Sequence, residues 1–595
     1  MQNGVSSAKA FTTIPGLLLH ATSRYSRSNA LNFPDGGRWL PLSHAELRSA
    51  VEHLSLGLLE EGVKKGDRVG LIAPSSPLWV AVDMAIQCAG AVTVPLFKRI
   101  SVESFTHEVR DSGMRWLFVG NPNEMPMAFE HARDKTTLVT FWYSGRHEHF
   151  EQIMKRGRER SLREPGLFES LCRGVAPSDL LTIIYTSGSM GLPKGVELTQ
   201  ANLVSQVHAT TQAFPSSAAA DTALSVLPPE HIFERMSLYF YIAGGIPVYF
   251  VDDPKRVADY MKEVKPTIMT VVPRILEKAA MGLQRAAQET PGAKGLVARA
   301  AVARARRRPV GSPLGPLDRV FDKAVYERMR HALGGRMHQL ISGASRLSPE
   351  VAAFLINVGI PVYEGYGLTE ASPVISANTP GRRKVGTVGR AFPGVEIRIA
   401  SDGEILARGP NVMRGYHNNP AATGASVDAE GWLHTGDLGS LDADGYLTVT
   451  GRTKELFKKS TGEYVPPGPI EEALGTIPYV DSALTVADNR AYVVALLFPD
   501  PQKLAAFKKS VGLETLSDAE FLKSDFLRAY TQKRINEINA HLHHTERVER
   551  FVILDHAASV EGGELTPTLK LRRFAVEKEY AEVIEEMYRS IGGWK

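Results

Sequence analysis

Two hydrophobic periods alternate along the first part of this chain. In residues 43–61 apolar side chains recur every three or four positions, which predicts an amphipathic helix. A turn rich in glycine and charge follows, and then an apolar run ending near Pro74 that is typical of a buried strand. The same alternation predicts a helix over 79–88 and a strand over 91–96. Such a succession indicates parallel sheets covered by helices, with ligands bound at the carboxyl ends of the strands.

The longest uncharged apolar run, residues 236–251, is shorter than the roughly 20 residues that span a bilayer. A Gly-Gly-Ile-Pro sequence at 244–247 interrupts it, so we expect a buried helix that turns into a strand. Residues 1–34 contain three basic and no acidic side chains, a weak likeness to a transit peptide. We favour the alternative that residues 11–20 begin the first helix of the fold.

Composition narrows the class of protein. A chain of 595 residues is too long for one hydrophobic core and predicts two or more domains. The net charge of +4 gives no support to nucleic-acid binding, and we expect no nucleic-acid partner. Cys88 and Cys172 are far apart in the sequence and lie among apolar residues, as free thiols of a reducing compartment do. We therefore expect a cytoplasmic protein without a disulfide framework or a Cys-rich metal site.

The segment IIYTSGSMGLPKGVELT, residues 183–199, follows an apolar strand and is suited to bind a polyphosphate. Its glycines permit close backbone approach, its hydroxyls can donate to phosphate oxygens, and its lysine can neutralise an outer phosphate. These residues are Thr186, Ser187, Gly188, Ser189, Gly191 and Lys194. A Walker A loop is excluded because Pro193 precedes the lysine and residues 196–198 indicate a second strand instead of a helix. The alternative is an ordinary hairpin rich in serine and glycine.

Four later segments carry polar residues in comparable settings. They are YEGYGLTEASP at 363–373, GWLHTGDLG at 431–439, DGYLTVTGRTKELFKKSTGEYV at 444–465 and LTPTLKLRR at 565–573. An acid beside a polyphosphate is repulsive unless a cation lies between them, which makes Glu370 a candidate Mg²⁺ ligand. Together, in this order, the five segments resemble the adenylate-forming superfamily, which includes acyl-CoA synthetases, aryl-CoA ligases, luciferases and peptide-synthetase adenylation domains.

The resemblance covers nearly the whole chain and implies an α/β fold. A large N-terminal domain of stacked αβ subdomains with mostly parallel sheets would span residues 1–451. A small mobile α+β domain would span residues 452–595, because the boundary is predicted just after the strand YLTVTG. The implied cofactors are ATP, Mg²⁺ and coenzyme A. A carboxylate would attack the α-phosphate of ATP and release pyrophosphate, and a thiol would then attack the acyl-adenylate and release AMP.

The resemblance also assigns the nucleotide and metal contacts. Tyr366, with Gly367, would lie along the purine face, and the turn after a strand would frame the adenine. That turn contains Gly343, Ala344 and Ser345. Thr369 and Glu370 would face the phosphates, with Glu370 and Thr186 as metal ligands. Asp437 would accept hydrogen bonds from the ribose hydroxyls, and Arg452 would lie near the sugar and the α-phosphate.

The implied catalytic residues are Lys570, Lys194, Thr186 and His231. Lys570 matches a lysine that reaches the α-phosphate and the attacking carboxylate, although a solvated basic patch is the plain alternative. His231 matches a position beside the acyl group, with a structural loop histidine as its alternative. Lys454 matches the hinge about which the small domain turns, and Gly462 lies in the loop that would enter the second active state.

Three segments narrow the resemblance to long-chain fatty acyl-CoA synthetases. They are LPPEHIFER at 227–235, VKPTIMTVVPRILEK at 264–278 and the helical stretch at 318–337. The predicted substrates are accordingly a fatty acid, ATP and coenzyme A. Three alternatives stay open: an acyl-AMP ligase that serves an acyl carrier protein, an aryl or medium-chain CoA ligase, and a non-catalytic lipid-binding protein. The last is disfavoured because Lys194, Glu370, Asp437, Arg452 and Lys570 are all present.

A basic segment lies between Thr290 and Leu317, where no acidic residue occurs. Its basic residues are Lys294, Arg299, Arg304, Arg306, Arg307 and Arg308. A basic amphipathic helix can lie on the anionic inner face of a membrane, which would suit a long-chain substrate. We favour a solvated helix followed by a loop, because charged runs usually face water. Peripheral membrane contact remains the alternative hypothesis.

Overall fold

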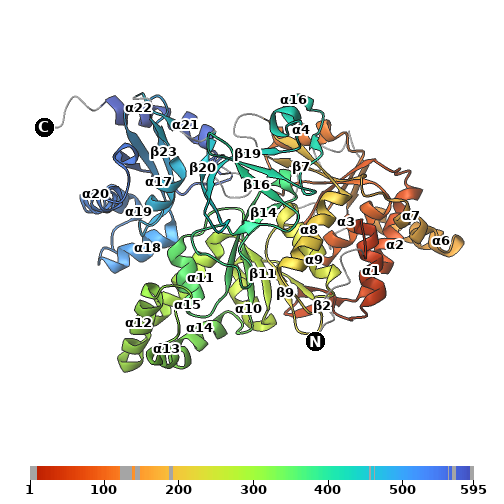
Figure 1. The fold of residues 1–595 in the computed structure, drawn as a ribbon, viewed down its shortest axis with the longest axis horizontal. Coiled ribbons are helices and arrows are strands. Elements are labelled where there is room, and N and C mark those ends of the chain that lie inside the picture. The colour runs from red at the N-terminus through yellow and green to blue at the C-terminus, as the bar shows by residue number, and fades with distance from the viewer. Residues whose placement is uncertain are drawn as a thin grey trace.

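The computed structural model describes residues 10–98, 100–120, 137–140, 148–186, 192–453, 457–460, 463–560, 562–565 and 571–589. Two large sheets with helices packed on them occupy most of the molecule, as Figure 1 shows from red through green. The last elements, drawn in blue, form a separate group at the upper left of that view. The predicted α/β fold with mostly parallel sheets is confirmed.

The larger sheet has nine strands and contains the turn predicted to frame the adenine. Its strands are, in spatial order, β15 (Arg390–Ala391), β14 (Val374–Ala377), β13 (Val362–Gly367), β12 (Gln339–Ser342), β11 (Ile268–Val271), β9 (Ala223–Ser225), β10 (Val248–Phe250), β1 (Leu31–Asp35) and β2 (Arg38–Leu42). The six central strands from β13 to β1 are parallel, and the remaining three are antiparallel at the edges. The carboxyl ends of β12 and β13 therefore lie at the same edge of this sheet.

The second sheet has seven strands and contains the predicted phosphate loop. In spatial order they are β18 (Gly415–Tyr416), β8 (Lys194–Thr199), β7 (Leu180–Thr186), β4 (Val92–Pro95), β3 (Arg68–Ile72), β5 (Trp116–Val119) and β6 (Thr137–Thr140). The strands from β7 to β6 are parallel, and β8 and β18 continue the sheet in antiparallel pairing. The strand predicted at 196–198 is confirmed as part of β8.

The helices of this part of the chain cover the two sheets. They are α1 (Ile14–Arg24), α2 (His44–Glu60), α3 (Pro77–Cys88), α4 (Val102–Ser112), α6 (Glu148–Arg163), α7 (Leu167–Gly174), α8 (Gln200–Ala213), α9 (Ile232–Ala243), α10 (Val257–Val264), α11 (Pro273–Glu289), α12 (Gly292–Arg307), α13 (Pro316–Phe321), α14 (Glu327–Ala332), α15 (Pro349–Asn357) and α16 (Pro420–Ser426). Helix α2 begins after Ser43, whose side chain and that of Glu46 form a reciprocal capping box.

Smaller sheets follow toward the C-terminus. One contains β16 (Glu396–Ile399), β17 (Glu404–Arg408), β19 (Leu433–Leu441) and β20 (Leu447–Arg452), all antiparallel. The last elements are β21 (Phe457–Lys458), β22 (Tyr464–Val465), α17 (Pro467–Leu474), β23 (Val480–Val486), β24 (Val493–Pro499), α18 (Pro501–Ser510), α19 (Asp518–Leu522), α20 (Asp525–Asn539), β25 (Val548–Ile553), α21 (Arg573–Glu579) and α22 (Ala581–Arg589). Strands β23, β24 and β25 form a three-stranded sheet with β24 at its centre, and β21 pairs with β22 in a two-stranded sheet.

Hydrophobic packing follows the same division of the chain. Among the described residues, two buried apolar clusters contain only residues from Phe457 onward. The other three contain only residues up to Leu433. The two parts also meet through ion pairs, because the Arg274 guanidinium of α11 lies 2.7 Å from the Asp481 carboxylate of β23. The contact between the two parts thus includes charged groups, whereas each part has apolar cores of its own.

The elements predicted from periodicity are present with shifted ends. The helix expected from residue 11 begins at Ile14, because the Thr13 side chain caps it and accepts a hydrogen bond from Gly16. The interrupted apolar run forms the end of α9, a turn and β10, as predicted.

Cys88 and Cys172 are free and buried, and burial together with a hydrogen bond to Cys172 raises the pKa of Cys88. Within the described residues, no helix is long and apolar enough to cross a membrane.

Candidate nucleotide-binding site

Strands β7 and β8 hold the two ends of the predicted phosphate loop. Thr186 ends β7, Lys194 begins β8, and their backbones are paired in the antiparallel ladder. Because these residues face each other, the loop between them starts and ends at one point of the sheet. The predicted phosphate contacts at 187–191 lie outside the described residues. The structure thus places Thr186 and Lys194 at the base of this loop.

Tyr416 links Lys194 to the predicted metal ligand. The Lys194 ammonium lies 5.0 Å from the centre of the Tyr416 ring, within the range of a cation–π interaction. The Tyr416 hydroxyl donates a 2.8 Å hydrogen bond to the Glu370 carboxylate. Burial first, and then the neighbouring Glu370, raise the pKa of Tyr416, so its hydroxyl stays protonated and keeps donating. Lys194 and Glu370, 176 positions apart in sequence, are brought to one place by this ring.

A second group joins the residues predicted to bind the purine and the ribose. The Tyr366 hydroxyl at the end of β13 donates a 2.6 Å hydrogen bond to the Asp437 carboxylate of β19. The Arg452 guanidinium of β20 lies 3.0 Å from the other oxygen of that carboxylate. Strands β19 and β20 pair Asp437 with Arg452 directly, which fixes this ion pair. The short helix Thr369–Ala371, just after Gly367, connects this group to Glu370.

The turn after β12 has the conformation of a constrained loop. Ala344 has a φ of +72°, a left-handed value that a residue with a side chain rarely adopts. Gly343 is packed so closely that an added Cβ would lie 3.1 Å from the ring of Phe233. Ser345 is exposed next to them. Such local strain is concentrated at ligand sites, which supports the predicted role of this turn.

Helix α9 carries His231 to the same side of the sheet as the turn. His231 is the N-cap residue of α9, and its ring centre lies 4.6 Å from that of Phe97. Two residues later, Phe233 approaches Gly343 in the turn predicted to frame the adenine. The start of α9 therefore lies near that turn, and the role of His231 beside the acyl group stays a prediction.

Comparison with known proteins identifies the family to which this chain belongs. A family model described as AMP-binding enzyme matches residues 18–417, and one described as AMP-binding enzyme C-terminal domain matches residues 455–592. The chain belongs to the AMP-binding enzyme family. "Long-chain-fatty-acid--CoA ligase FadD15" of Mycobacterium bovis is 32% identical over 562 residues, which cover 93% of each chain. "Long-chain-fatty-acid--CoA ligase 6" of Mus musculus is 30% identical over 92% of this chain and 82% of its own.

Solved structures agree on the fold of this AMP-binding enzyme. The A domain of carboxylic acid reductase from Segniliparus rugosus, in complex with AMP and a co-purified carboxylic acid, superimposes with a TM-score of 0.74. The match covers 98% of this chain and 94% of that one at 21% sequence identity. At this identity the likeness establishes the architecture shared by the two chains.

The residues at Glu370 fit a magnesium ion that a nucleotide brings with it. Among the described side chains, no group of three or more His, Cys, Asp or Glu residues could hold a metal alone. Glu370 supplies one carboxylate, and Thr186 lies at the base of the phosphate loop. One carboxylate completed by phosphate oxygens and water is the ligand set that Mg²⁺ commonly takes. The site thus suits a metal bound together with ATP.

Several predicted residues lie outside the described part of the chain. They are Ser187, Gly188, Ser189, Gly191, Lys454, Gly462 and Lys570. Among the described ones, Lys194 and Glu370 meet at Tyr416, and Tyr366 and Arg452 meet at Asp437. His231 and the turn at 343–345 instead contact Phe97 and Phe233, respectively. Asp437 lies within β19 and is 5% exposed.

Sequence reasoning missed a buried polar network beneath these groups. Arg235 of α9 pairs with Asp83 of α3 and donates a 2.8 Å hydrogen bond to the Thr182 hydroxyl of β7. Asp83 also accepts a 2.8 Å hydrogen bond from the Thr93 hydroxyl of β4. Gln87 of α3 continues the network to Thr93. It therefore connects β7, which leads into the phosphate loop, with the helix that begins at His231.

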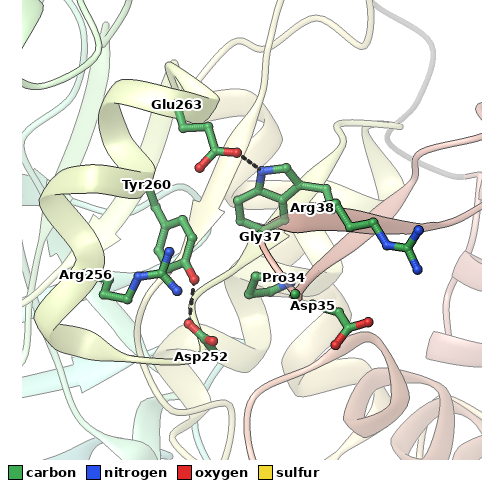
Figure 2. Close-up of a pocket in the computed structure, with 10 residues that line it drawn as sticks. Pro34, Asp35, Gly37, Arg38, Asp252, Arg256, Tyr260 and Glu263 are labelled. Carbon is green, nitrogen blue, oxygen red and sulfur yellow. Dashed lines mark hydrogen bonds between the residues drawn. The ribbon is translucent and has the colours of Figure 1, made fainter.

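A hollow elsewhere on the AMP-binding enzyme is separate from these residues. It lies between the β1–β2 turn and α10, and Figure 2 shows two hydrogen bonds between side chains that line it. The Trp39 indole donates to Glu263 at 2.8 Å, and the Tyr260 hydroxyl donates to Asp252 at 2.7 Å. Because these polar atoms are already paired, the hollow does not require a ligand.

Glu230, next to His231, provides a test of stability against pH. It is 2% exposed, one carboxyl oxygen has no hydrogen-bond partner among the described residues, and burial raises its pKa to about 7. Between its ordinary pKa and 7, the folded state keeps a proton that the unfolded state has lost, so stability falls as pH rises. We expect Glu230→Gln to match the wild type at pH 4.5 and to exceed it increasingly toward pH 7, by up to ~1.4 kcal/mol per pH unit.

The measurement is the urea midpoint of both proteins across this pH range. Glu151→Gln, at an exposed position on α6, is the matched control and should give a constant difference from the wild type. A pH-independent difference for Glu230→Gln would show that Glu230 is already ionised in the folded protein.

Proposed function

We propose that this enzyme activates a long-chain fatty acid with ATP and transfers the acyl group to coenzyme A. The observation that carries the proposal is the joined set Lys194–Tyr416–Glu370 beside Tyr366–Asp437–Arg452. This set includes two cations, a carboxylate that can bind a metal ion and a carboxylate that can accept hydrogen bonds from the ribose. The long-chain-fatty-acid–CoA ligases among its relatives, at 30% and 32% identity, supply the substrate class.

The first half-reaction brings two anions together, so charge neutralisation is the main task of the protein. Asp437, held by Tyr366 and Arg452, receives the ribose hydroxyls and sets the position of the α-phosphate. Lys194 faces the outer phosphates, and Lys570 is assigned to the α-phosphate and the attacking carboxylate. Glu370 and Thr186 would hold Mg²⁺, which supplies a positive charge to the phosphate oxygens when bound. The carboxylate then attacks the α-phosphorus and pyrophosphate leaves.

The second half-reaction requires the thiol of coenzyme A to reach the acyl-adenylate. The sulfur attacks the acyl carbon and its thiol proton is released to solvent, while the bond to the AMP oxygen breaks and AMP leaves with that electron pair. We propose that residues 1–451 and 452–595 are two domains and that the smaller one turns about Lys454 between the half-reactions. Separate hydrophobic clusters and charged contacts support this division. Interfaces of this polar kind permit relative motion.

Pyrophosphate release against a panel of carboxylic acids tests the activity. We expect release with long-chain acids, faster turnover when coenzyme A is added, and acyl-CoA as the product. Release with a carrier protein and none with coenzyme A would favour the acyl-AMP ligase alternative. A preference for aryl or medium-chain acids would change the substrate class, and no release with any acid would support a non-catalytic lipid-binding protein.

Lys454→Pro tests the hinge. Proline fixes φ near −65°, so the substitution should hold the small domain in one orientation. We expect pyrophosphate release to persist and thioester formation to fall by about 100-fold, the order of loss caused by misplaced reacting groups. Single-turnover assays of each half-reaction measure this. Equal losses in both half-reactions, or no loss in either, would place the hinge at another residue.

A further inference from the structure

The corner formed by α12, α13 and the loop between them exposes large apolar side chains. Of the twelve large hydrophobic residues that are exposed in the described chain, five lie between residues 296 and 320. They are Leu296, Val297, Leu314, Leu317 and Val320, with exposed fractions from 41% to 65%. Helix α12 contacts α13, and both lie at the lower left corner of the molecule in Figure 1. Such a concentration of exposed apolar surface indicates an interaction site.

The packing of α12 explains why these side chains face outward. The fully buried residues of the helix are all small, namely Gly295, Ala298, Ala301 and Ala305, and Val302 packs partly buried against the same core. They pack toward α11 and α15, which contact α12. Leucine and valine at 296 and 297 are thus placed on the outside although the helix has an apolar inner face. In this helix the small residues are buried and Leu296 and Val297 are exposed, whereas large apolar residues are usually buried.

The corner carries a net positive charge, and both of its acidic side chains are paired with arginines. From residue 290 to 323 the basic residues are Lys294, Arg299, Arg304, Arg306, Arg307, Arg308, Arg319 and Lys323, and the acidic ones are Asp318 and Asp322. Arg304 binds Asp318 through two hydrogen bonds of 2.9 and 3.1 Å. Hydrogen bonds from Arg304 and the Gly315 amide lower the pKa of Asp318 to about 2. Asp322 is paired with Arg330 at 2.6 Å.

The arginines of the corner divide into structural and unpaired ones. Arg304 holds α13 through Asp318, and Arg308 donates a 3.0 Å hydrogen bond to the side chain of Asn357 in α15. Arg306 and Arg307 are exposed and make no hydrogen bond or ion pair within the described part of the chain. The charges available to a partner are therefore those of Arg306 and Arg307, together with Lys294 and Arg319.

We propose that this corner binds the surface of an anionic lipid bilayer. Exposed leucines and unpaired arginines suit the acyl and headgroup regions of such a surface, because apolar side chains enter the acyl boundary while cations meet the headgroups. The corner is also fixed rather than loose, since Asn357 donates to the carbonyls of Ala305 and Arg308 at 2.9 and 2.7 Å. The structure thus changes our preference from a solvated helix to a membrane-binding one.

Co-sedimentation of the full chain with phosphatidylcholine vesicles containing a rising fraction of phosphatidylglycerol tests the proposal. ATP is omitted, so the outcome is independent of the proposed ligase activity. We expect binding that increases with anionic lipid and weakens with salt. Arg306→Gln/Arg307→Gln should lower the partition coefficient by about 25-fold, at about fivefold for each charge. Leu314→Ser/Leu317→Ser/Val320→Ser should also bind more weakly, and its remaining binding should disappear at high salt.

Matched controls lie on the exposed side of other helices. Arg158→Gln/Arg173→Gln removes two exposed charges from α6 and α7, and Leu162→Ser removes an apolar side chain that is 75% exposed on α6. Both should bind vesicles as the wild type does. Equal urea midpoints for all variants confirm that their fold is intact. Equal binding by the wild type and the Arg306→Gln/Arg307→Gln variant at low salt would overturn the proposal, as would no binding by the wild type.

Insertion can be measured directly because both cysteines of the chain are buried. A Leu317→Cys variant labelled with an environment-sensitive dye should show a blue shift and brighter emission with anionic vesicles. Leu162→Cys with the same label should show neither change. An unchanged spectrum at residue 317 would contradict insertion of the apolar side chains.

Discussion

Lys570→Ala should abolish formation of the acyl-adenylate while supplied acyl-adenylate and coenzyme A are still converted to thioester. Lys570 lies outside the described residues, and its role is inferred from the segment LTPTLKLRR. On either side of Lys570, the described residues Leu565 and Leu571 form an antiparallel bridge. The resemblance assigns the lysine to the small domain, whose movement would bring it to the α-phosphate and withdraw it again.

The expected loss in adenylation is about 100- to 1000-fold, the usual cost of removing one group that stabilises developing charge. Pyrophosphate release in a single turnover measures the first half-reaction, and thioester formation from purified acyl-adenylate measures the second. Lys578→Ala, at an exposed position of α21, is the matched control and should retain both. Normal ATP-dependent adenylation by Lys570→Ala would remove this residue from the mechanism.

The two strands that flank the predicted phosphate loop were predictable because their signal is local. A strand, a run of glycines and hydroxyls, a lysine and a second strand occur within 17 residues, and β7 and β8 form as expected. The two helices and two strands predicted from periodicity also form: α2 buries one apolar face, and α3, β3 and β4 are buried almost throughout. Local patterns of this sort need no knowledge of distant contacts.

The rest of the site depends on contacts between distant segments. Tyr416 carries no motif, and its link to Lys194 and Glu370 exists because β18 pairs with β8. The contacts of Asp437 could not be predicted from its own segment, because β17 and β20 pair with its strand on both sides and Tyr366 binds its carboxylate. The basic segment is a further case, because its sequence does not say which apolar side chains are buried. Only the packing of α12 shows that Ala298, Ala301 and Ala305 face inward while Leu296 is exposed.

Arg235→Met should cause the largest loss of stability, about 3–5 kcal/mol, because it leaves Asp83 as a buried charge without its partner. The side chains of Arg235 and Asp83 are 0% and 1% exposed. In the wild type the Arg235 Nε lies 2.9 Å from Asp83 Oδ2, and Tyr239 also donates to that carboxylate. Without the guanidinium, two hydroxyl donors cannot offset the cost of keeping a carboxylate out of water.

Arg285→Met is the matched control, because Arg285 forms an exposed ion pair with Glu289 at 2.6 Å. An exposed pair of this kind contributes about 0–1 kcal/mol. Urea unfolding followed by tryptophan fluorescence should separate the two variants by several kcal/mol. The double variant Asp83→Leu/Arg235→Met should recover part of the loss, since two apolar side chains can replace a buried ion pair. Similar midpoints for Arg235→Met and Arg285→Met would show that Asp83 is protonated or hydrated in the folded state.

The same substitution separates folding from catalysis. Arg235 donates to Thr182 in β7, and β7 ends at Thr186, where the phosphate loop begins. The helix that carries Arg235 begins after His231, which is predicted to lie beside the acyl group. Loss of the ion pair should therefore raise the KM for ATP in the fraction of protein that stays folded, because both groups lose their common support. If the folded fraction kept the wild-type KM, the network would stabilise the fold without positioning the nucleotide site.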